Sequence, residues 1–426
     1  MSGRLQAPRG TFDVLPEQAG ARATVERTAR EVLEDAGYER IETPVFESTE
    51  LFSRGVGEAT DIVRKEMYSF DDGGGRSLTL RPEGTAPVCR AYVEHGMHRL
   101  AAPVKLWYLS SFFRHERAQA GRYRQFWQVG AEALGSEDPA LDAESIVLLA
   151  TLLERLGARD LRLHLSSLGR PETRTAYREE LTEHLRAHAH SLSEEVRERI
   201  ELNPLRAFDS DHPGTREVMA GAPRLLDRLD AEDAEHFATL RGLLDRADVA
   251  YEVDPTLVRG LDYYTRTVFE FSSAALGAQS GVGGGGRYDR LVAELGGPET
   301  AGVGWAAGVE RILLASSMAS GVAPPLELFV AYPSMAQRAD AFSTAVAARR
   351  AGLSVRLELA GRSLKGQLKQ ADRLRARLVA ILEADGAVLK DREGSGQTPV
   401  TPEEPGGPVT PAAVVAAALR RLRSPA

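Results

Sequence analysis

The sequence is poor in cysteine: Cys89 is the only one among 426 residues. A single cysteine excludes a disulfide within the chain, a cysteine-rich zinc site and an iron–sulfur cluster. Long apolar runs are missing too, because none reaches the roughly 18 residues that a membrane span needs, and Met1 to Gly10 has no apolar targeting core. We therefore expect a cytoplasmic protein with no membrane partner.

An excess of positive charge is also absent, since the net charge is −8. This value argues against a protein whose whole surface binds nucleic acid. The charge is uneven, however. Residues 326–426 carry 15 basic and 10 acidic residues, a net charge of +5, which leaves −13 for the remainder. A polyanion would therefore bind locally.

The pattern of the sequence divides the chain into four segments. Residues 1–169 and 251–320 mix strand-like and helical patterns, and together we expect them to form one core. Residues 170–250 are charged, helical in period and poor in β-branched residues, which predicts an inserted helical domain. Residues 326–426 alternate strands with helices and predict a separate α/β domain with a mostly parallel sheet.

The most informative segment is a predicted β-hairpin. Two runs rich in β-forming residues, Val104 to Phe113 and Arg124 to Leu134, flank a basic turn. The turn contains Arg114, Arg117, Gly121 and Arg122. Arg114 and the loop arginines could reach phosphate oxygens. The pattern is equally compatible with an exposed hairpin whose basic tip is solvated.

The second run of this hairpin has two different faces, because strand side chains alternate. Gln125, Trp127, Val129, Ala131 and Ala133 form a largely apolar face that should pack against a core. The opposite face consists of Arg124, Phe126, Gln128, Gly130 and Glu132. It offers a ring, an amide, a gap at the glycine and a carboxylate, which is typical of the floor of a ligand site.

Other segments carry weaker signals. A helix over residues 24–36 precedes a strand over 39–46, where Pro44 indicates an edge strand or a subunit contact. After the strand 77–80, Glu83 could bind an ammonium group, although such a residue is more often a partner in a helix N-cap.

Three further patterns bear on possible ligands. Gly281 to Gly286 matches G-x-G-x-x-G, but no βαβ unit surrounds it, so a glycine-rich turn beside a ligand fits better than a dinucleotide-binding fold. His184 and His188 lack a third metal ligand nearby, which favours solvated helix residues. A helix over residues 309–319 begins with Glu310 and Arg311, where an anion could lie.

The sequence contains no Walker A motif, metal cluster or Ser/His/Asp arrangement that spacing identifies. The remaining chemistry is charge neutralisation and positioning around a nucleotide.

These segments resemble the histidyl-tRNA synthetases, a family of class II aminoacyl-tRNA synthetases. The segments that carry the resemblance are Ala7-Pro-Arg-Gly-Thr, the helix and strand ending at Thr43-Pro44 (motif 1), Arg81-Pro-Glu-Gly-Thr, Phe113-Arg-His-Glu-Arg with Gly121-Arg-Tyr-Arg-Gln-Phe (motif 2), Gly304 to Arg311 (motif 3), Arg259-Gly-Leu-Asp-Tyr-Tyr and Gly285-Gly-Arg-Tyr-Asp. The resemblance implies an α+β fold with a six- or seven-stranded antiparallel sheet, a helical insertion domain and a C-terminal α/β anticodon-binding domain. It also implies a homodimer built on motif 1.

The implied activity has two steps. The carboxylate of L-histidine attacks the α-phosphate of ATP, with Mg²⁺ on the phosphates, to give histidyl-adenylate and pyrophosphate. The histidyl group then passes to the 3′ end of tRNA(His). The resemblance assigns no protein side chain to the metal ion.

The resemblance also implies roles for individual residues. Arg114 and Arg259 would bind the α-phosphate and the substrate carboxylate, and Arg259 would stabilise transition-state charge. Glu116 would contact the adenine amino group and Phe126 would stack on its ring, while Arg122 and Arg311 would bind the γ-phosphate. The implied histidine contacts are Glu83, Thr85 and Gln128 for the ammonium group and Glu132, Tyr264 and the nearby Tyr263 for the imidazole. The implied tRNA contacts are Gln119 for the acceptor end and Arg362, Lys365 and Lys369 in the basic C-terminal segment.

Two other functions share this core. One is the non-catalytic, synthetase-like regulatory subunit of ATP phosphoribosyltransferase, which binds histidine as a signal. It typically lacks both the signature at residues 259–264 and the C-terminal domain. The other is a class II synthetase for a different amino acid.

Overall fold

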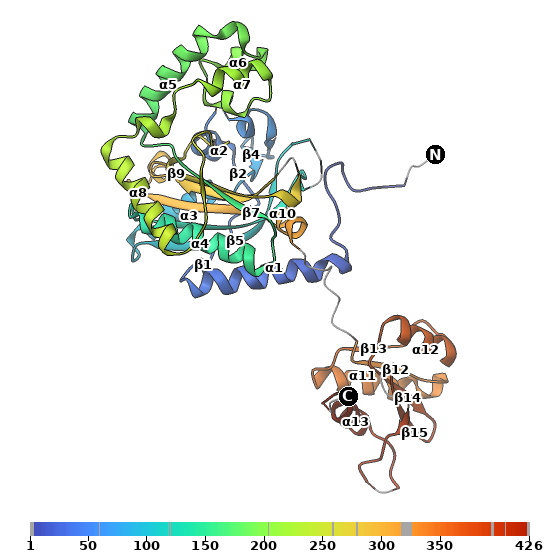
Figure 1. Cartoon of the computed structure of the whole chain (residues 1–426). Coiled ribbons are helices and arrows are strands. Elements are labelled where there is room, and N and C mark those ends of the chain that lie inside the picture. Colours follow the sequence, from blue (N-terminus) through green and yellow to red (C-terminus); the bar gives the residue numbers. More distant parts are fainter. Residues whose placement is uncertain are drawn as a thin grey trace. The chain divides into compact units, whose positions relative to one another are not determined.

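The computed structural model describes residues 4–58, 60–117, 119, 121–202, 204–257, 260–277, 280–316, 326–392, 396–404 and 406–423. The chain divides into two compact units, Met1–Gly321 and Val322–Ala426 (Figure 1). In these described ranges no helix combines the length and the apolar character needed to cross a membrane.

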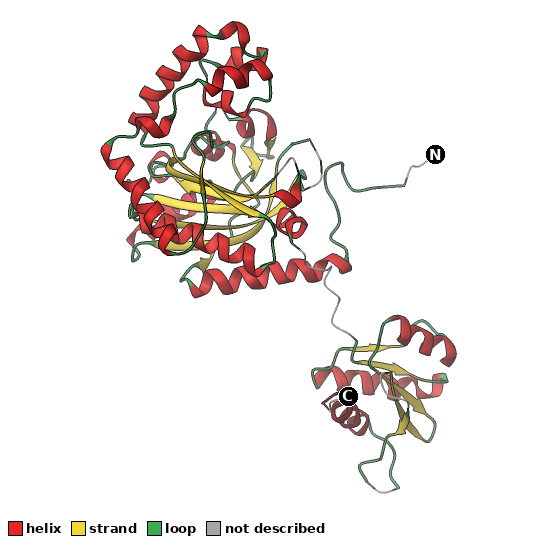
Figure 2. Cartoon of the chain, viewed as in Figure 1, coloured by secondary structure: helices red, strands yellow, loops and turns green. Residues whose placement is uncertain are grey.

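The first unit is built on an eight-stranded sheet, which appears yellow in Figure 2. The strands in spatial order are β1 (Glu39–Arg40), β5 (Val104–Phe113), β6 (Gln125–Leu134), β11 (Gly302–Gly308), β10 (Gly281–Arg287), β9 (Thr265–Ser273), β7 (Leu161–Ser167) and β8 (Glu252–Val253). The six central strands are antiparallel, whereas the two-residue edge strands β1 and β8 run parallel to their neighbours. With these edge strands the sheet has eight strands, whereas six or seven were expected. Each edge strand has only two residues, which is too few to produce an alternating pattern in the sequence.

The hairpin of β5 and β6 confirms the alternation expected from the sequence. Val129, Ala131 and Ala133 are buried in one hydrophobic core with the helices α1 (Pro16–Asp35) and α4 (Pro139–Arg155). Helix α1 begins eight residues earlier than expected, because Pro16 occupies a first-turn position where its missing N–H costs nothing.

One expected strand is broken in two. Residues 39–46 were expected to be continuous, but β2 (Phe46–Ser48) leaves the large sheet and pairs with β4 (Ser77–Leu80), which also pairs with β3 (Tyr68–Asp71). At the break, the Arg81 guanidinium donates to the carbonyl oxygens of Thr43, at 2.7 Å, and Pro44, at 3.3 Å. A side chain thus satisfies carbonyls that a continuous strand would pair with backbone.

The glycine run forms strand β10 and not the expected turn. A Cβ on Gly285 would lie 1.9 Å from the carbonyl oxygen of Gly304 and 2.6 Å from the Cα of Trp305, both on β11. Glycine is therefore required here by the close approach of two strands. Strand β10 is antiparallel to both of its neighbours, β9 and β11, unlike the parallel strands of a dinucleotide-binding βαβ unit.

Helices cover both faces of the sheet and form the insertion. Outside the insertion, the first unit also contains the helices α2 (Thr49–Val56), α3 (Thr85–Glu94), α9 (Leu291–Glu294) and α10 (Val309–Ala315). Those of the insertion are α5 (Pro171–Ala187), α6 (Glu194–Arg199), α7 (Pro213–Ala220) and α8 (Ala231–Arg246). His188 is exposed on the insertion, but His184 is half-buried and its Nε2 lies 3.1 Å from the Val218 carbonyl oxygen. Across the described residues no group of three or more histidine, cysteine, aspartate or glutamate side chains could hold a metal ion.

The second unit contains a five-stranded sheet with the order β13-β12-β14-β15-β16. Its parallel strands are β12 (Leu328–Ala331), β13 (Val355–Leu357) and β14 (Leu378–Glu383), and its antiparallel strands are β15 (Gly386–Asp391) and β16 (Gln397–Pro399). Its helices are α11 (Arg338–Arg350), α12 (Leu364–Arg373) and α13 (Pro411–Arg423). The parallel strands agree with the expected α/β pattern, whereas β15 and β16 were not expected.

Candidate active site

A cavity of about 380 Å³ lies over the middle of the large sheet. Its walls come from the end of β5, the hairpin loop, β6, β10, β11 and the start of α10. Of the residues singled out in the sequence, it brings together Arg114, Glu116, Arg122, Phe126, Gln128 and Arg311. The base of the hairpin loop therefore lines a cavity, while Arg117 and Gln119 at its tip are exposed to solvent.

Three arginines, Arg114, Arg122 and Arg311, line this cavity together with three glutamates, Glu116, Glu270 and Glu310. The Arg114 Cζ lies 5.5 Å from the centre of the Phe126 ring, and its Nε donates to the Pro82 carbonyl oxygen at 2.9 Å. Arg311 Nε donates to the carbonyl oxygen of Gly281. Burial, and then the nearby Arg122 guanidinium, lower the pKa of Arg311. Like charges held this close favour a polyanionic ligand.

The described residues of the hairpin loop contact one another. Glu116 lies 3.4 Å from Arg122 Nη1 and 3.9 Å from Arg114 Nη1. Gln119 and Arg122 exchange two backbone hydrogen bonds of 3.1 and 2.9 Å, and Gly121 adopts the left-handed conformation with φ of +74°. Gln119 is exposed and is not among the described residues that line the cavity. Arg259, which the sequence analysis singled out, lies outside the described residues.

A second, buried polar cluster lies further along β6. The carboxylate of Glu132 is fully buried and accepts hydrogen bonds from Tyr288 Oη at 2.5 Å, Thr85 Oγ1 at 2.8 Å and Tyr108 Oη at 3.2 Å. Burial raises the pKa of Glu132 to about 8, although the three hydroxyls oppose the shift. A buried carboxylate held by three donors is a fixed acceptor for one further group.

Glu83 connects this cluster to helix α3. Its two carboxylate oxygens accept from the backbone N–H groups of Thr85, at 2.8 Å, and Ala86, at 3.0 Å, as a helix-capping partner would. Tyr263 Oη lies 3.3 Å from Glu83, and the Tyr263 ring centroid lies 4.7 Å from that of Tyr264. Because Thr85 contacts both carboxylates, the two acidic side chains belong to one site.

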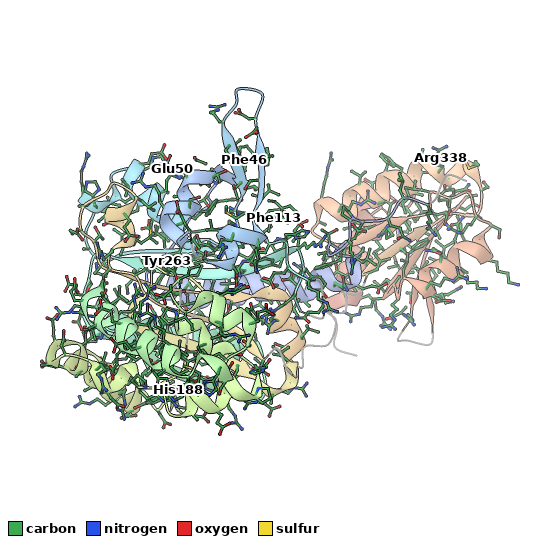
Figure 3. The ribbon with its side chains drawn as sticks, turned by 90° about the horizontal axis from the view of Figure 1, so that it is seen from above. Phe46, Glu50, Phe113, His188, Tyr263 and Arg338 are labelled. Carbon is green, nitrogen blue, oxygen red and sulfur yellow. The ribbon has the colours of Figure 1, made fainter. Side chains whose placement is uncertain are left out.

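The cavity and the buried cluster adjoin each other. Arg114 contacts the carbonyl of Pro82, the residue before Glu83. Gln128 lines the cavity, and its buried Oε1 has no hydrogen-bond partner among the described residues. Two labelled residues in Figure 3 mark the two parts of the site: Phe113, the residue before Arg114, and Tyr263 of the buried cluster.

Tyr108 and Tyr288 are contacts that the sequence analysis missed. The gap expected at Gly130 is filled by the Tyr108 ring, because a Cβ on Gly130 would lie 2.2 Å from Tyr108 Cζ. Tyr108 is the register partner of Gly130 on β5. Pairing the residues of the two predicted strands across the hairpin would have placed Tyr108 opposite Gly130.

We expect Gly130→Ala to lower the free energy of unfolding by about 1–3 kcal/mol, the usual cost of overpacking, because the new methyl group would clash with Tyr108. Thermal or denaturant unfolding measures this change. Gly242→Ala is a matched control, since a Cβ there would meet nothing within 4 Å. An equal free energy of unfolding for the two variants would mean that the Tyr108 ring does not fill the space above Gly130.

The basic residues singled out near the C-terminus lie in the second unit. Arg362, Lys365 and Lys369 are exposed, and the last two lie one turn apart on α12. Arg362 Nη1 lies 3.3 Å from both oxygens of the buried Glu358. Lys365 and Lys369 are thus exposed cations on α12, whereas the charge of Arg362 is partly offset by Glu358.

Comparison with known proteins decides the family. A family model described as Histidyl-tRNA synthetase matches residues 10–312, which include every wall of the cavity and the buried cluster. This chain belongs to the histidyl-tRNA synthetase family. The Histidine--tRNA ligase of Halorhodospira halophila is 50% identical over 401 residues, covering 92% of this chain and 94% of that protein.

Solved structures agree with this membership. The crystal structure of apo S. aureus histidyl-tRNA synthetase superimposes with a TM-score of 0.77 at 33% identity, covering 93% of this chain and 97% of that one. A Bacillus halodurans protein titled an ATP phosphoribosyltransferase regulatory subunit/histidyl-tRNA synthetase has a TM-score of 0.65 at 23% identity, covering 90% of this chain and 100% of that one. At that identity the likeness shows the fold alone. Membership confirms the expected α+β class II fold with a C-terminal domain.

Proposed function

We propose that this chain is a histidine–tRNA ligase, which activates L-histidine with ATP and transfers the histidyl group to the 3′ end of tRNA(His). The proposal rests on one observation, that an arginine-lined cavity and a buried carboxylate lie next to each other. A cavity with three arginines, Arg114, Arg122 and Arg311, adjoins a buried carboxylate held by three hydroxyl groups.

ATP would occupy the cavity. Phe126 would stack on the adenine ring, and Glu116 would accept a hydrogen bond from its amino group. Arg122 and Arg311 would bind the γ-phosphate, because their two positive charges lie close to each other. Arg114, at the edge nearest Glu83, would bind the α-phosphate.

Histidine would bind beside Arg114. Its ammonium group would contact Glu83, Thr85 and Gln128, whose Oε1 needs a donor. Its imidazole would lie against Glu132 and Tyr264, with Tyr263 nearby. A carboxylate offers about four acceptor positions. The described hydroxyl groups occupy three of those on Glu132, which leaves one for an imidazole N–H.

The first reaction needs no protein nucleophile. The histidine carboxylate would attack the α-phosphate, and negative charge would build up on the phosphate oxygens and on the leaving pyrophosphate. Arg114 and Arg259 would stabilise that charge from fixed positions. The protein contributes orientation and electrostatics.

Mg²⁺ would bind together with ATP. This ion takes oxygen ligands and usually needs only one or two protein carboxylates besides phosphate oxygens. Glu270 fits that requirement, because it lines the cavity and its charge acts on Arg311. When bound, Mg²⁺ neutralises charge on the phosphates.

The tRNA would be bound by both units. We assign residues 1–169 and 251–320 to the catalytic core, 170–250 to the insertion domain and 326–426 to the anticodon-binding domain. Gln119, exposed in the hairpin loop, would meet the acceptor end. Arg362, Lys365 and Lys369 would contact tRNA phosphates.

A homodimer built on motif 1 is part of the proposal, as is a cytoplasmic location. Beside the break in the motif 1 strand, the side chains of Val45, Phe46 and Phe70 are 43%, 51% and 44% exposed. Figure 3 shows the small sheet that carries Phe46 projecting from the first unit. Exposed apolar groups that adjoin one another are typical of an interface.

The alternative is the histidine-binding regulatory subunit without catalysis. It is less well supported, because the chain contains the signature at residues 259–264 and a second compact unit.

Exchange of labelled pyrophosphate into ATP tests the proposed function. We expect exchange with histidine and with none of the other standard amino acids. Binding of histidine without exchange would favour the regulatory alternative. Exchange with another amino acid in place of histidine would favour a different specificity.

A further inference from the structure

We propose that Arg22, on helix α1, is a positioning residue for the ATP site and acts through Glu310. This inference deepens the proposed function and rests on it. The two residues are 288 positions apart in the sequence, and neither position nor spacing pointed to the pair.

The pair is close and shielded from solvent. Arg22 Nη2 lies 2.5 Å from Glu310 Oε1, and the two side chains are 16% and 8% exposed. The Arg22 Cζ also lies 4.6 Å from the Trp127 ring centroid and 5.5 Å from that of Phe12. Aromatic rings on a guanidinium restrict its position and exclude water from it.

Glu310 has a second fixed partner. Its Oε2 accepts from the backbone N–H of Trp127 at 3.1 Å. One carboxylate thus joins helix α1, the first residues of β6 and the start of α10.

Two of these three elements, β6 and α10, carry walls of the cavity. Trp127 lies between Phe126 and Gln128 in the sequence, and Arg311 follows Glu310. Phe126, Gln128, Glu310 and Arg311 all line the cavity. A shift of Glu310 would therefore move the adenine platform relative to the γ-phosphate arginine, although Arg22 itself is not among the described lining residues.

A purely structural ion pair would behave differently. On the same helix, Arg27 and Glu31 form a pair of 3.1 Å whose side chains are 62% and 49% exposed. Exposed pairs of this kind contribute little, because water solvates both charges. Removing one partner of a shielded pair leaves the other charge uncompensated.

The test compares Arg22→Met with Arg27→Met in the full-length protein. We expect Arg22→Met to weaken ATP binding, measured by titration calorimetry, and to raise the KM for ATP in pyrophosphate exchange by about tenfold or more. The KM for histidine should change by less than about threefold, because the pair contacts no described residue of the histidine cluster. Arg27→Met should match the wild type in both parameters.

A mutant cycle with Glu310→Gln sharpens the test. When Glu310 is already glutamine, Arg22→Met should have a smaller effect on ATP binding than in the wild-type background, because no buried charge is left unpaired. The inference is overturned if Arg22→Met binds ATP within twofold of the wild type. It is also overturned if the KM values for ATP and histidine rise equally, or if the two substitutions are additive.

The ATP titration separates this inference from the proposed function. A wild-type protein that binds ATP but does not exchange pyrophosphate with histidine would refute the proposed function alone. The comparison of ATP binding between wild type and Arg22→Met would still decide the role of Arg22.

Discussion

Arg114→Ala lowers histidine-dependent pyrophosphate exchange by on the order of 100-fold or more in our account, while the fold persists. The guanidinium lies over the Phe126 ring and donates to the carbonyl of Pro82, the residue before Glu83 of the buried cluster. In the proposed binding mode this fork-shaped cation binds the α-phosphate, and alanine offers no charge or donor in its place. Exchange rates at saturating ATP and histidine, together with a circular dichroism melt, measure both parts of this expectation.

Arg117→Ala is the matched control. Arg117 lies in the same loop and is exposed, but it is not among the described residues that line the cavity. We expect its substitution to leave exchange close to the wild-type rate. Near-normal turnover of Arg114→Ala, or equal losses in the two variants, would reject a specific role for Arg114.

Glu132→Gln has the second large effect. We expect the KM for histidine to rise by about 100-fold, within the cost of leaving a buried hydrogen-bonding group without its partner, while the KM for ATP changes little. Glutamine keeps the shape but replaces one acceptor oxygen with an NH2 donor. The imidazole would therefore lose its partner beside Tyr288, Thr85 and Tyr108. Initial-rate exchange with each substrate varied in turn measures the two constants.

The same variant changes how stability depends on pH. The pKa of Glu132 is raised from 4.5 to about 8 by burial, so the folded state holds this proton where the unfolded state has lost it. The contribution of Glu132 to the free energy of unfolding is therefore complete below about pH 4.5 and falls as pH rises toward 8. Glutamine does not titrate.

We therefore expect the Tm of Glu132→Gln, relative to the wild type, to increase between pH 5 and pH 8. Melting curves of both proteins across that range measure the difference, which cancels the titration of all other groups. A difference that stays constant with pH would mean that the carboxylate titrates normally.

Local pattern was enough to predict the hairpin and its two faces. Alternation along β6 placed Val129 and Ala131 in the core and Phe126, Gln128 and Glu132 on the ligand side, because a strand has a fixed period of two. The helical insertion and the α/β unit also followed from composition and period. These features depend on neighbours in the sequence, where physical rules are strong.

Features that depend on distant partners could not be predicted. Arg81 divides the motif 1 strand by binding the carbonyls of Thr43 and Pro44. The pairing of Arg22 with Glu310 requires a folded sheet before the two can meet. Strand β15 was not expected, although the strand before it was; the two pair across the short turn at Ala384-Asp385.

The central claim is that one continuous site binds ATP and histidine together. A crystal structure with histidine and a nonhydrolysable ATP analogue tests it most directly. We predict the phosphates among Arg114, Arg122 and Arg311, the adenine on Phe126 and the imidazole within hydrogen-bond distance of Glu132. A triphosphate bound elsewhere, or a histidine side chain directed away from Glu132, would contradict the account.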